Sequence, residues 1–189
     1  MVVLLTAVIH LLLPVAVKNK AIYIFLAFLL SLSFLLTQVN EVPAFYYLRG
    51  YIGDLSVTAT LFFSASVIQS VRGKALYQPV EKKYLMLLVI PGGLFLYPMA
   101  LGVSQFDPYR LGYQPQILLS VLFLAGLYFW HKQYYFLVFV LTSAGLCFSL
   151  GLLESNNLWD YLLDPMLLLV FLTMALMSAL KAGINQVWE

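Results

Sequence analysis

The sequence predicts an all-α fold, a polytopic bundle of about seven transmembrane helices in a single domain that covers residues 1–189. Of the 189 residues, 63% are hydrophobic and only 10% are charged, against about 25% in an ordinary soluble domain. The apolar runs are long and rich in Leu, with no alternation of polar and apolar positions, which favours helices over the strands of a membrane barrel. The lipid bilayer is therefore the first partner that we expect.

Long apolar runs supply the predicted spans. Because a helical span needs about 20 apolar residues, we place the spans at residues 1–17, 21–39, 51–71, 84–103, 117–130, 134–153 and 159–180. The first run carries no Lys or Arg, so we interpret it as a retained span rather than a signal peptide. The fourth contains Pro91-Gly92-Gly93 and Pro98, and because an interior Pro removes a backbone donor, we expect its helix to be broken there.

The basic residues divide the connections between spans into two sets. Eight of the ten Lys and Arg fall in alternate connections, namely Lys18, Lys20, Arg72, Lys74, Lys82, Lys83, Lys132 and Lys181. Short loops rich in Lys and Arg stay on the cytoplasmic side of a membrane. The sequence therefore predicts an N-terminus outside and a C-terminus inside.

Acidic residues collect on the opposite, outer side. Six of the eight lie there, namely Glu41, Asp54, Asp107, Glu154, Asp160 and Asp164. The positive-inside rule concerns Lys and Arg, so membrane insertion does not require this gathering of acids. We interpret it as a ligand-binding site on the outer side, formed by Glu41, Arg49, Asp54, Arg110, Glu154, Asp160 and Asp164.

Arg49 and Asp54 are predicted to pair at the mouth of the third span. Asp54 is expected about one turn inside that helix, where a charge is costly and usually finds a partner. Gly50 and Gly53 remove side chains beside both residues, so another helix or a ligand can approach closely. The alternative is that Asp54 caps the helix while Arg49 contacts lipid phosphate.

Asp160 and Asp164 are four residues apart, which would place them on one helix face. Like charges at this spacing repel unless a cation, a proton or an Arg lies between them. An N-cap role with Trp159 as an interface anchor is the alternative, and it explains Asp160 better than Asp164. Arg110 could complete the cluster from its own loop, although a simple surface turn also explains that loop.

The stretch Arg49-Gly50-Tyr51-Ile52-Gly53-Asp54 resembles the VanZ-like small bacterial membrane proteins, which carry an Arg-x-x-x-Gly-Asp type segment at a span mouth. The acid-rich stretch with Asp160 and Asp164 is similar to one before their last span. The predicted number of spans is higher here, and Pro165 departs from the pattern. The resemblance implies a multi-pass protein of the bacterial cell inner (cytoplasmic) membrane, part of the envelope and concerned with cell-wall or glycolipid chemistry.

Two classes of function fit these residues. The first is a binding or accessory subunit whose outer site holds a polar lipid head group or a glycan, together with a membrane-protein partner. The second is a membrane-embedded enzyme acting on a lipid-linked substrate, with Asp160 and Asp164 as general base or divalent-metal ligands. A cation-coupled transporter is a weaker alternative, because only His10 is expected near mid-membrane.

Several kinds of chemistry lack their sequence signals. There is no metal-spaced Cys/His set, no glycine-rich phosphate loop and no G-x-S-x-G elbow. No basic block with interleaved aromatic residues indicates nucleic-acid binding. We therefore predict no cofactor, no metal site and no nucleic-acid partner, and we name no catalytic residue.

Overall fold

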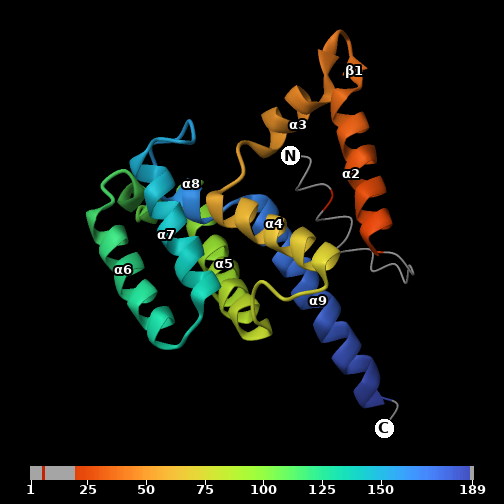
Figure 1. Cartoon of the computed structure of the whole chain (residues 1–189). Helices are drawn as coiled ribbons and strands as arrows, with labels where there is room; N and C mark the ends of the chain where they lie inside the picture. Colours follow the sequence, from red (N-terminus) through yellow and green to blue (C-terminus); the bar gives the residue numbers. More distant parts are fainter. Residues whose placement is uncertain (1–5, 7–19, 188–189) are drawn as a thin grey trace.

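Helices make up nearly all the regular structure in the computed structural model, which describes Thr6 and residues 20–187 (Figure 1). In chain order the elements are α2 (Lys20–Leu36), β1 (Gln38–Val39), β2 (Val42–Pro43), α3 (Ala44–Ile52), α4 (Val57–Arg72), α5 (Pro79–Ala100), η1 (Pro108–Gly112), α6 (Gln116–His131), α7 (Tyr135–Ser149), α8 (Trp159–Leu162) and α9 (Pro165–Val187). The predicted all-α class is confirmed. The first predicted span, 1–17, and His10 lie outside the described residues, Thr6 excepted.

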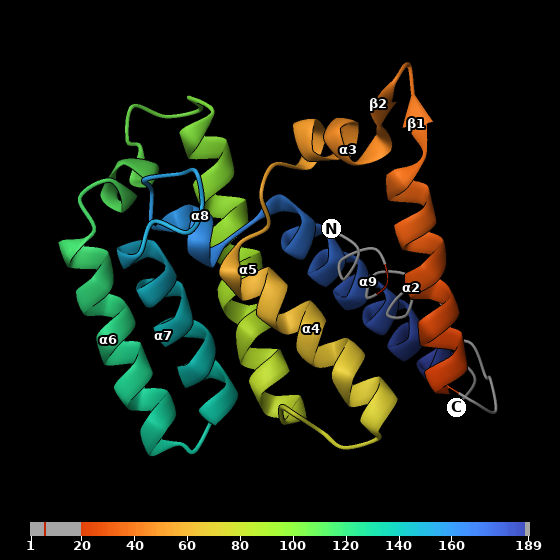
Figure 2. The same ribbon diagram turned by 45° about the horizontal axis from the view of Figure 1, so that its top comes forward.

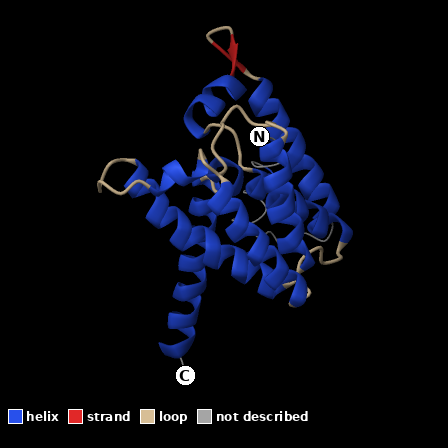
Figure 3. Cartoon of the chain, turned by 90° about the vertical axis from the view of Figure 1, so that its left-hand side faces the viewer, coloured by secondary structure: helices blue, strands red, loops and turns tan. Residues whose placement is uncertain are grey.

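The long helices pack side by side around an aromatic core. Contacts join α6 to α7, α5 to α9, α4 to α7 and α2 to α4. Phe62, Phe63 and Phe171 are fully buried, and the rings of Phe62 and Phe171 meet edge to face with centroids 4.9 Å apart. The short antiparallel hairpin of β1 and β2 projects away from these helices (Figure 3).

The basic and acidic connections that the sequence divides into two sets lie at opposite ends of the helices. Figure 2 shows the α4–α5 and α6–α7 turns, residues 73–78 and 132–134, at one end, which we call the basic end because it carries Lys74 and Lys132. The hairpin, α3, η1 and α8 lie at the other end, which we call the acidic end. Glu41, Asp54 and Asp160 belong to elements or connections at this acidic end.

The described helices are shorter than the predicted spans. By length and composition, α5 is the one helix among the described residues long and apolar enough to cross a membrane. Four other apolar segments are shorter, namely Ile22–Leu36, Gln116–His131, Tyr135–Ser149 and Pro165–Leu180. The number of spans stays a prediction.

The predicted break in the fourth span is wrong. Helix α5 continues from Pro79 to Ala100 with Pro91 and Pro98 inside it. The glycines after Pro91 serve close packing instead: a Cβ built on Gly93 would lie 2.8 Å from Leu168 Cδ2. Gly93 therefore allows close contact between α5 and α9, since a larger residue would have to displace the Leu168 side chain.

The positions of Asp54, Asp160 and Asp164 also differ from expectation, because α4 and α9 begin later than the predicted third and seventh spans. Helix α3 ends before Gly53, whose φ of 74° and ψ of −164° suit only glycine. Asp54 then lies in a linker, residues 53–56, and Ser56 caps α4 by accepting from Ala59 N. Asp54 is thus neither inside that helix nor its cap.

Asp160 and Asp164 do not share a helix face. Helix α8 ends at Leu162, and Leu163 is extended, with φ −123° and ψ 143°. Helix α9 begins only at Pro165, because a proline disfavours helical conformation in the residue before it. The chain therefore bends between the two aspartates.

Candidate functional site

Four predicted acids line one cavity at the acidic end. This outer cavity has a volume of about 750 Å³. Its lining consists of Gly53, Asp54, Tyr97, Ala100, Leu101, Tyr109, Leu153, Glu154, Ser155, Asp160, Leu163, Asp164 and Pro165. The lining comes from the linker after α3, the end of α5, η1 and the chain around α8. The fold thus assembles the site from segments far apart in the sequence.

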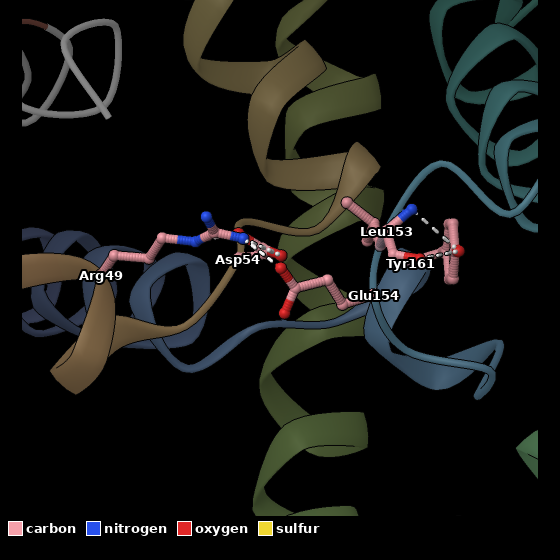
Figure 4. Close-up of polar contacts among 5 residues, drawn as sticks. All are labelled: Arg49, Asp54, Leu153, Glu154 and Tyr161. Carbon is pink, nitrogen blue, oxygen red and sulfur yellow. Dashed lines mark hydrogen bonds and ion pairs between the residues drawn. The ribbon is translucent and has the colours of Figure 1, made fainter. Parts of the chain in front are cut away.

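Arg49 connects two of these acids, as Figure 4 shows. Its Nε donates to Asp54 Oδ1 at 3.0 Å and its Nη2 to Asp54 Oδ2 at 3.2 Å, while Nη2 also donates to Glu154 Oε1 at 2.7 Å. The hydrogen bond and charge of Asp54, and then the charge of Glu154, raise the pKa of Arg49. This Arg49–Asp54–Glu154 network ties α3 to the loop after α7.

A second hollow of about 490 Å³ adjoins the network. It is lined by Phe45, Arg49, Gly53, Asp54, Leu55, Thr60, Leu152, Leu153 and Glu154. Because Asp54 and Glu154 also line the outer cavity, the network lies between the two spaces.

Asp160 is held by two hydroxyl groups within the outer cavity. Tyr109 Oη donates to its Oδ2 at 2.7 Å, and Ser155 Oγ donates to the same oxygen. Burial, and then the hydrogen bond to Asp160, raise the pKa of Tyr109. The phenol therefore stays protonated and acts as a donor to the carboxylate.

Asp164 has a structural position at the deep side of the cavity. The residue is only 5% exposed, and it accepts from Ser56 N at 3.1 Å, Ser56 Oγ at 2.8 Å and Leu167 N at 2.7 Å. Asp164 thus joins the linker before α4 to the first turn of α9.

Hydrogen bonds to the Tyr161 hydroxyl hold the loop that carries Glu154 and Ser155. The Tyr161 side chain is fully buried, and its hydroxyl accepts from Leu153 N at 3.1 Å (Figure 4). The same hydroxyl donates to Ser155 O at 3.2 Å. The two residues that flank Glu154 are therefore held by a buried aromatic side chain.

The residues around Asn157 hold η1 against the loop before α8. Asn157 is fully buried; its Nδ2 donates to Tyr109 O at 3.0 Å and its Oδ1 accepts from Trp159 N at 2.9 Å. Gly112 O accepts from Leu158 N at 3.0 Å, and a Cβ built on Gly112 would lie 1.7 Å from Asn157 Oδ1. This contact, which we call the Gly112–Asn157 clamp, brings Tyr109 to Asp160.

Sequence reasoning missed the residues that position the acids. Ser56 and Asn157 are of types that favour helix N-caps and turns, and each precedes a helical stretch. The sequence could therefore have indicated both as capping or turn residues. Tyr109 and Gly112 left none, because their roles depend on contacts with residues about 50 positions later.

Glu41 and Arg110 lie apart from the outer cavity. Glu41 is exposed in the turn of the hairpin, with φ of 65°. Arg110 lines a separate hollow of about 410 Å³. Asp107 accepts from Tyr109 N at 2.9 Å and caps η1, which agrees with the surface-turn alternative for that loop. The predicted seven-residue set therefore divides among several places.

The arrangement suits hydrogen-bond donors. In the cavity, carboxylates of Asp54, Glu154 and Asp160 can accept from hydroxyl or amine groups. Within the part of the chain that the structure describes, no group of three or more His, Cys, Asp or Glu is arranged to hold a metal ion.

Comparison with known proteins places the chain beside none of them. No family model, no curated protein and no solved structure matches it. The resemblance of residues 49–54 to VanZ-like proteins stays a prediction.

Proposed function

We propose that this protein spans the bacterial cytoplasmic membrane and that its outer cavity binds the hydroxyl- or amine-bearing head group of a polar lipid or lipid-linked glycan. One observation carries the proposal: carboxylates from separate segments line a cavity whose remaining wall is largely apolar. Small-molecule sites commonly combine an apolar wall with a few convergent polar groups. In this role the protein acts as a binding or accessory subunit beside a membrane-protein partner.

Exposed apolar side chains support the membrane location. Leu30 of α2, Leu87 of α5, Phe123 of α6 and Leu169 of α9 are 70%, 62%, 66% and 56% exposed. Only 22% of the apolar window of α5 is buried, which is low for the core helix of a soluble bundle. Large apolar side chains exposed on four helices would be covered if lipid or another protein surrounded them. With the basic end in the cytoplasm, the acidic end faces outward.

Charge supports the class of head group. Asp54, Glu154, Asp160 and Asp164 all line the outer cavity, whereas Arg49 lines only the adjoining hollow. A phosphate entering the outer cavity would meet several carboxylates and be repelled. Hydroxyl and amine groups donate hydrogen bonds to carboxylates, and such charge-assisted bonds are stronger than neutral ones.

An enzyme acting on a lipid-linked substrate is the second candidate. The observation that favours it is the hydrogen-bonded group of Tyr109, Asp160 and Ser155 on the cavity wall. A carboxylate within reach of a bound hydroxyl can accept its proton as a general base. Hydrolysis or transfer of a bound glycolipid by the purified protein, lost in Asp160→Asn, would favour this candidate over simple binding.

Binding of matched lipids tests the proposal. In an alkyl oligo(ethylene glycol) ether detergent, native mass spectrometry should show tighter binding of monoglucosyl diacylglycerol than of diacylglycerol with the same chains. Glu154→Gln and Asp160→Asn should each weaken binding of the glucosyl lipid, by about tenfold for loss of a charge-assisted hydrogen bond. Glu41→Gln, which removes an exposed acid outside the cavity, is the matched control and should have no effect. Equal binding of the two lipids would refute the proposal.

A further inference from the structure

Consecutive residues of η1 belong to two different hollows. Tyr109 lines the outer cavity and donates to Asp160, whereas Arg110 lines the separate hollow of about 410 Å³. We propose that this second hollow, the Arg110 site, binds the phosphate group of an anionic membrane phospholipid. One side of η1 would then hold an uncharged or cationic head group and the other side an anionic one.

The lining of the Arg110 site is rich in donors. It consists of Arg110, Leu111, Tyr113, Gln114, Gln116 and Ile117. A guanidinium carries five N–H donors and each glutamine amide carries two more, while the tyrosine hydroxyl can also donate. The lining contains no carboxylate, so the charge of this hollow favours an anion, in contrast to the outer cavity.

Arg110 also differs from Arg49 in its pairing. Asp54 and Glu154 both accept from Arg49, which neutralises that guanidinium. Arg110 is exposed, and among the described residues neither of the two ion pairs involves it. A planar guanidinium without a carboxylate partner matches phosphate oxygens bidentately.

The backbone adds to the attraction. Gln116 is the first residue of α6, and its N-cap, Pro115, makes no side-chain capping bond. The first backbone N–H groups of a helix lack partners within the helix and lie at the positive end of its dipole. They complement an anion that Arg110 holds in the adjacent hollow.

An apolar strip on α6 identifies the ligand as a lipid rather than free phosphate. Ile117, Val121 and Leu124 recur at spacings of four and three, so they share one face of α6, and they are 64%, 54% and 64% exposed. The strip starts at the Arg110 site, since Ile117 belongs to both. A phospholipid with its phosphate at Arg110 would lay an acyl chain along this strip, whereas a soluble phosphate would gain nothing from it.

Titration of phosphatidylglycerol tests the inference. In the same ether detergent, the wild-type protein should bind phosphatidylglycerol more tightly than diacylglycerol of the same chains. Arg110→Gln should weaken phosphatidylglycerol binding by about tenfold, as loss of one charge-assisted hydrogen bond predicts. Gln114→Glu, which places a carboxylate in the hollow at constant size, should weaken it at least as much. Arg72→Gln removes an exposed arginine at the basic end and should leave binding unchanged.

Three results would overturn the Arg110 site. They are unchanged binding in both Arg110→Gln and Gln114→Glu, equal weakening by Arg72→Gln, and displacement of the lipid by millimolar inorganic phosphate, which would indicate a free-anion site. Arg110→Gln should not alter binding of monoglucosyl diacylglycerol, because Arg110 does not line the outer cavity. The two proposals can therefore fail separately.

Discussion

At the scale of single residues, Arg49 illustrates how the acidic end combines charges that would otherwise repel. Its guanidinium lies between Asp54 and Glu154, and the side chains are 39%, 34% and 83% exposed. Exposed ion pairs are screened by water and salt and contribute little to stability. We therefore assign the network a positioning role: it sets where α3 and the loop before α8 meet beside the outer cavity.

A double-mutant cycle tests this pairing. Arg49→Gln and Asp54→Asn should each lower the midpoint of thermal unfolding slightly, and the double variant should lose less than the sum, because the second change removes a charge already without its partner. The coupling should shrink at high salt. Arg49→Gln with Glu41→Gln is the control and should be additive, since Glu41 lies in the hairpin turn. An additive Arg49/Asp54 pair would show that the two act separately.

At the scale of elements, sequence patterns predicted the long helices but not their ends at the site. The apolar runs indicated α2, α4, α5, α6, α7 and α9, because continuous hydrophobicity is a property of the local sequence. The start of α4 moved to Val57 and that of α9 to Pro165. Gly53 and Pro165 determine these ends through backbone conformation, which hydropathy does not measure.

The site itself was only partly predictable for a related reason. Four of the predicted acids line one cavity, and the sequence had grouped them because the charge pattern assigns them to the same predicted side. The sequence did not group their partners with them: Tyr109, Ser155 and Asn157 contribute through hydrogen bonds whose geometry depends on tertiary packing. Glu41 and Arg110 were grouped with the other residues because the charge pattern predicts at which end of the helices a loop lies. It does not predict toward which cavity the side chains of that loop point.

The Gly112–Asn157 clamp gives a testable case of one element positioning another. Gly112→Ala would force a methyl group against Asn157 Oδ1, 1.7 Å from an ideal Cβ, so η1 must shift from the loop. Overpacking of this kind typically costs about 1–3 kcal/mol, and displacement of Tyr109 should also weaken binding of monoglucosyl diacylglycerol. Thermal unfolding and lipid titration measure the two effects.

Gly126→Ala is the matched control for the clamp. Gly126 lies within α6, and a Cβ there has no atom within 4 Å. Alanine favours helix over glycine by about 1 kcal/mol, so this variant should be as stable as the wild type or more stable. Equal stability of the Gly112→Ala protein would show that the clamp does not hold η1.

At the scale of the whole molecule, the two ends of the helices have opposite character. Turns at the basic end carry Lys74 and Lys132, while the outer cavity opens among the loops of the acidic end. Apolar side chains are exposed along the helices between them, as the proposed membrane location requires. The account therefore makes a joint claim: the acidic end faces outward, and its cavity holds a head group.

Cysteine labelling of sealed, right-side-out membrane vesicles tests this joint claim most directly. In a Cys147→Ser background, which removes the single native cysteine, Leu101→Cys places a thiol at an 86% exposed position that lines the outer cavity. Ala75→Cys places one in the α4–α5 turn at the basic end. The account predicts that an impermeant maleimide labels position 101 but not position 75. It also predicts that octyl glucoside below its micellar concentration slows labelling at 101, whereas the octyl ether of tetraethylene glycol does not. Labelling at 75 alone, or a rate at 101 unaffected by the glucoside, would contradict it.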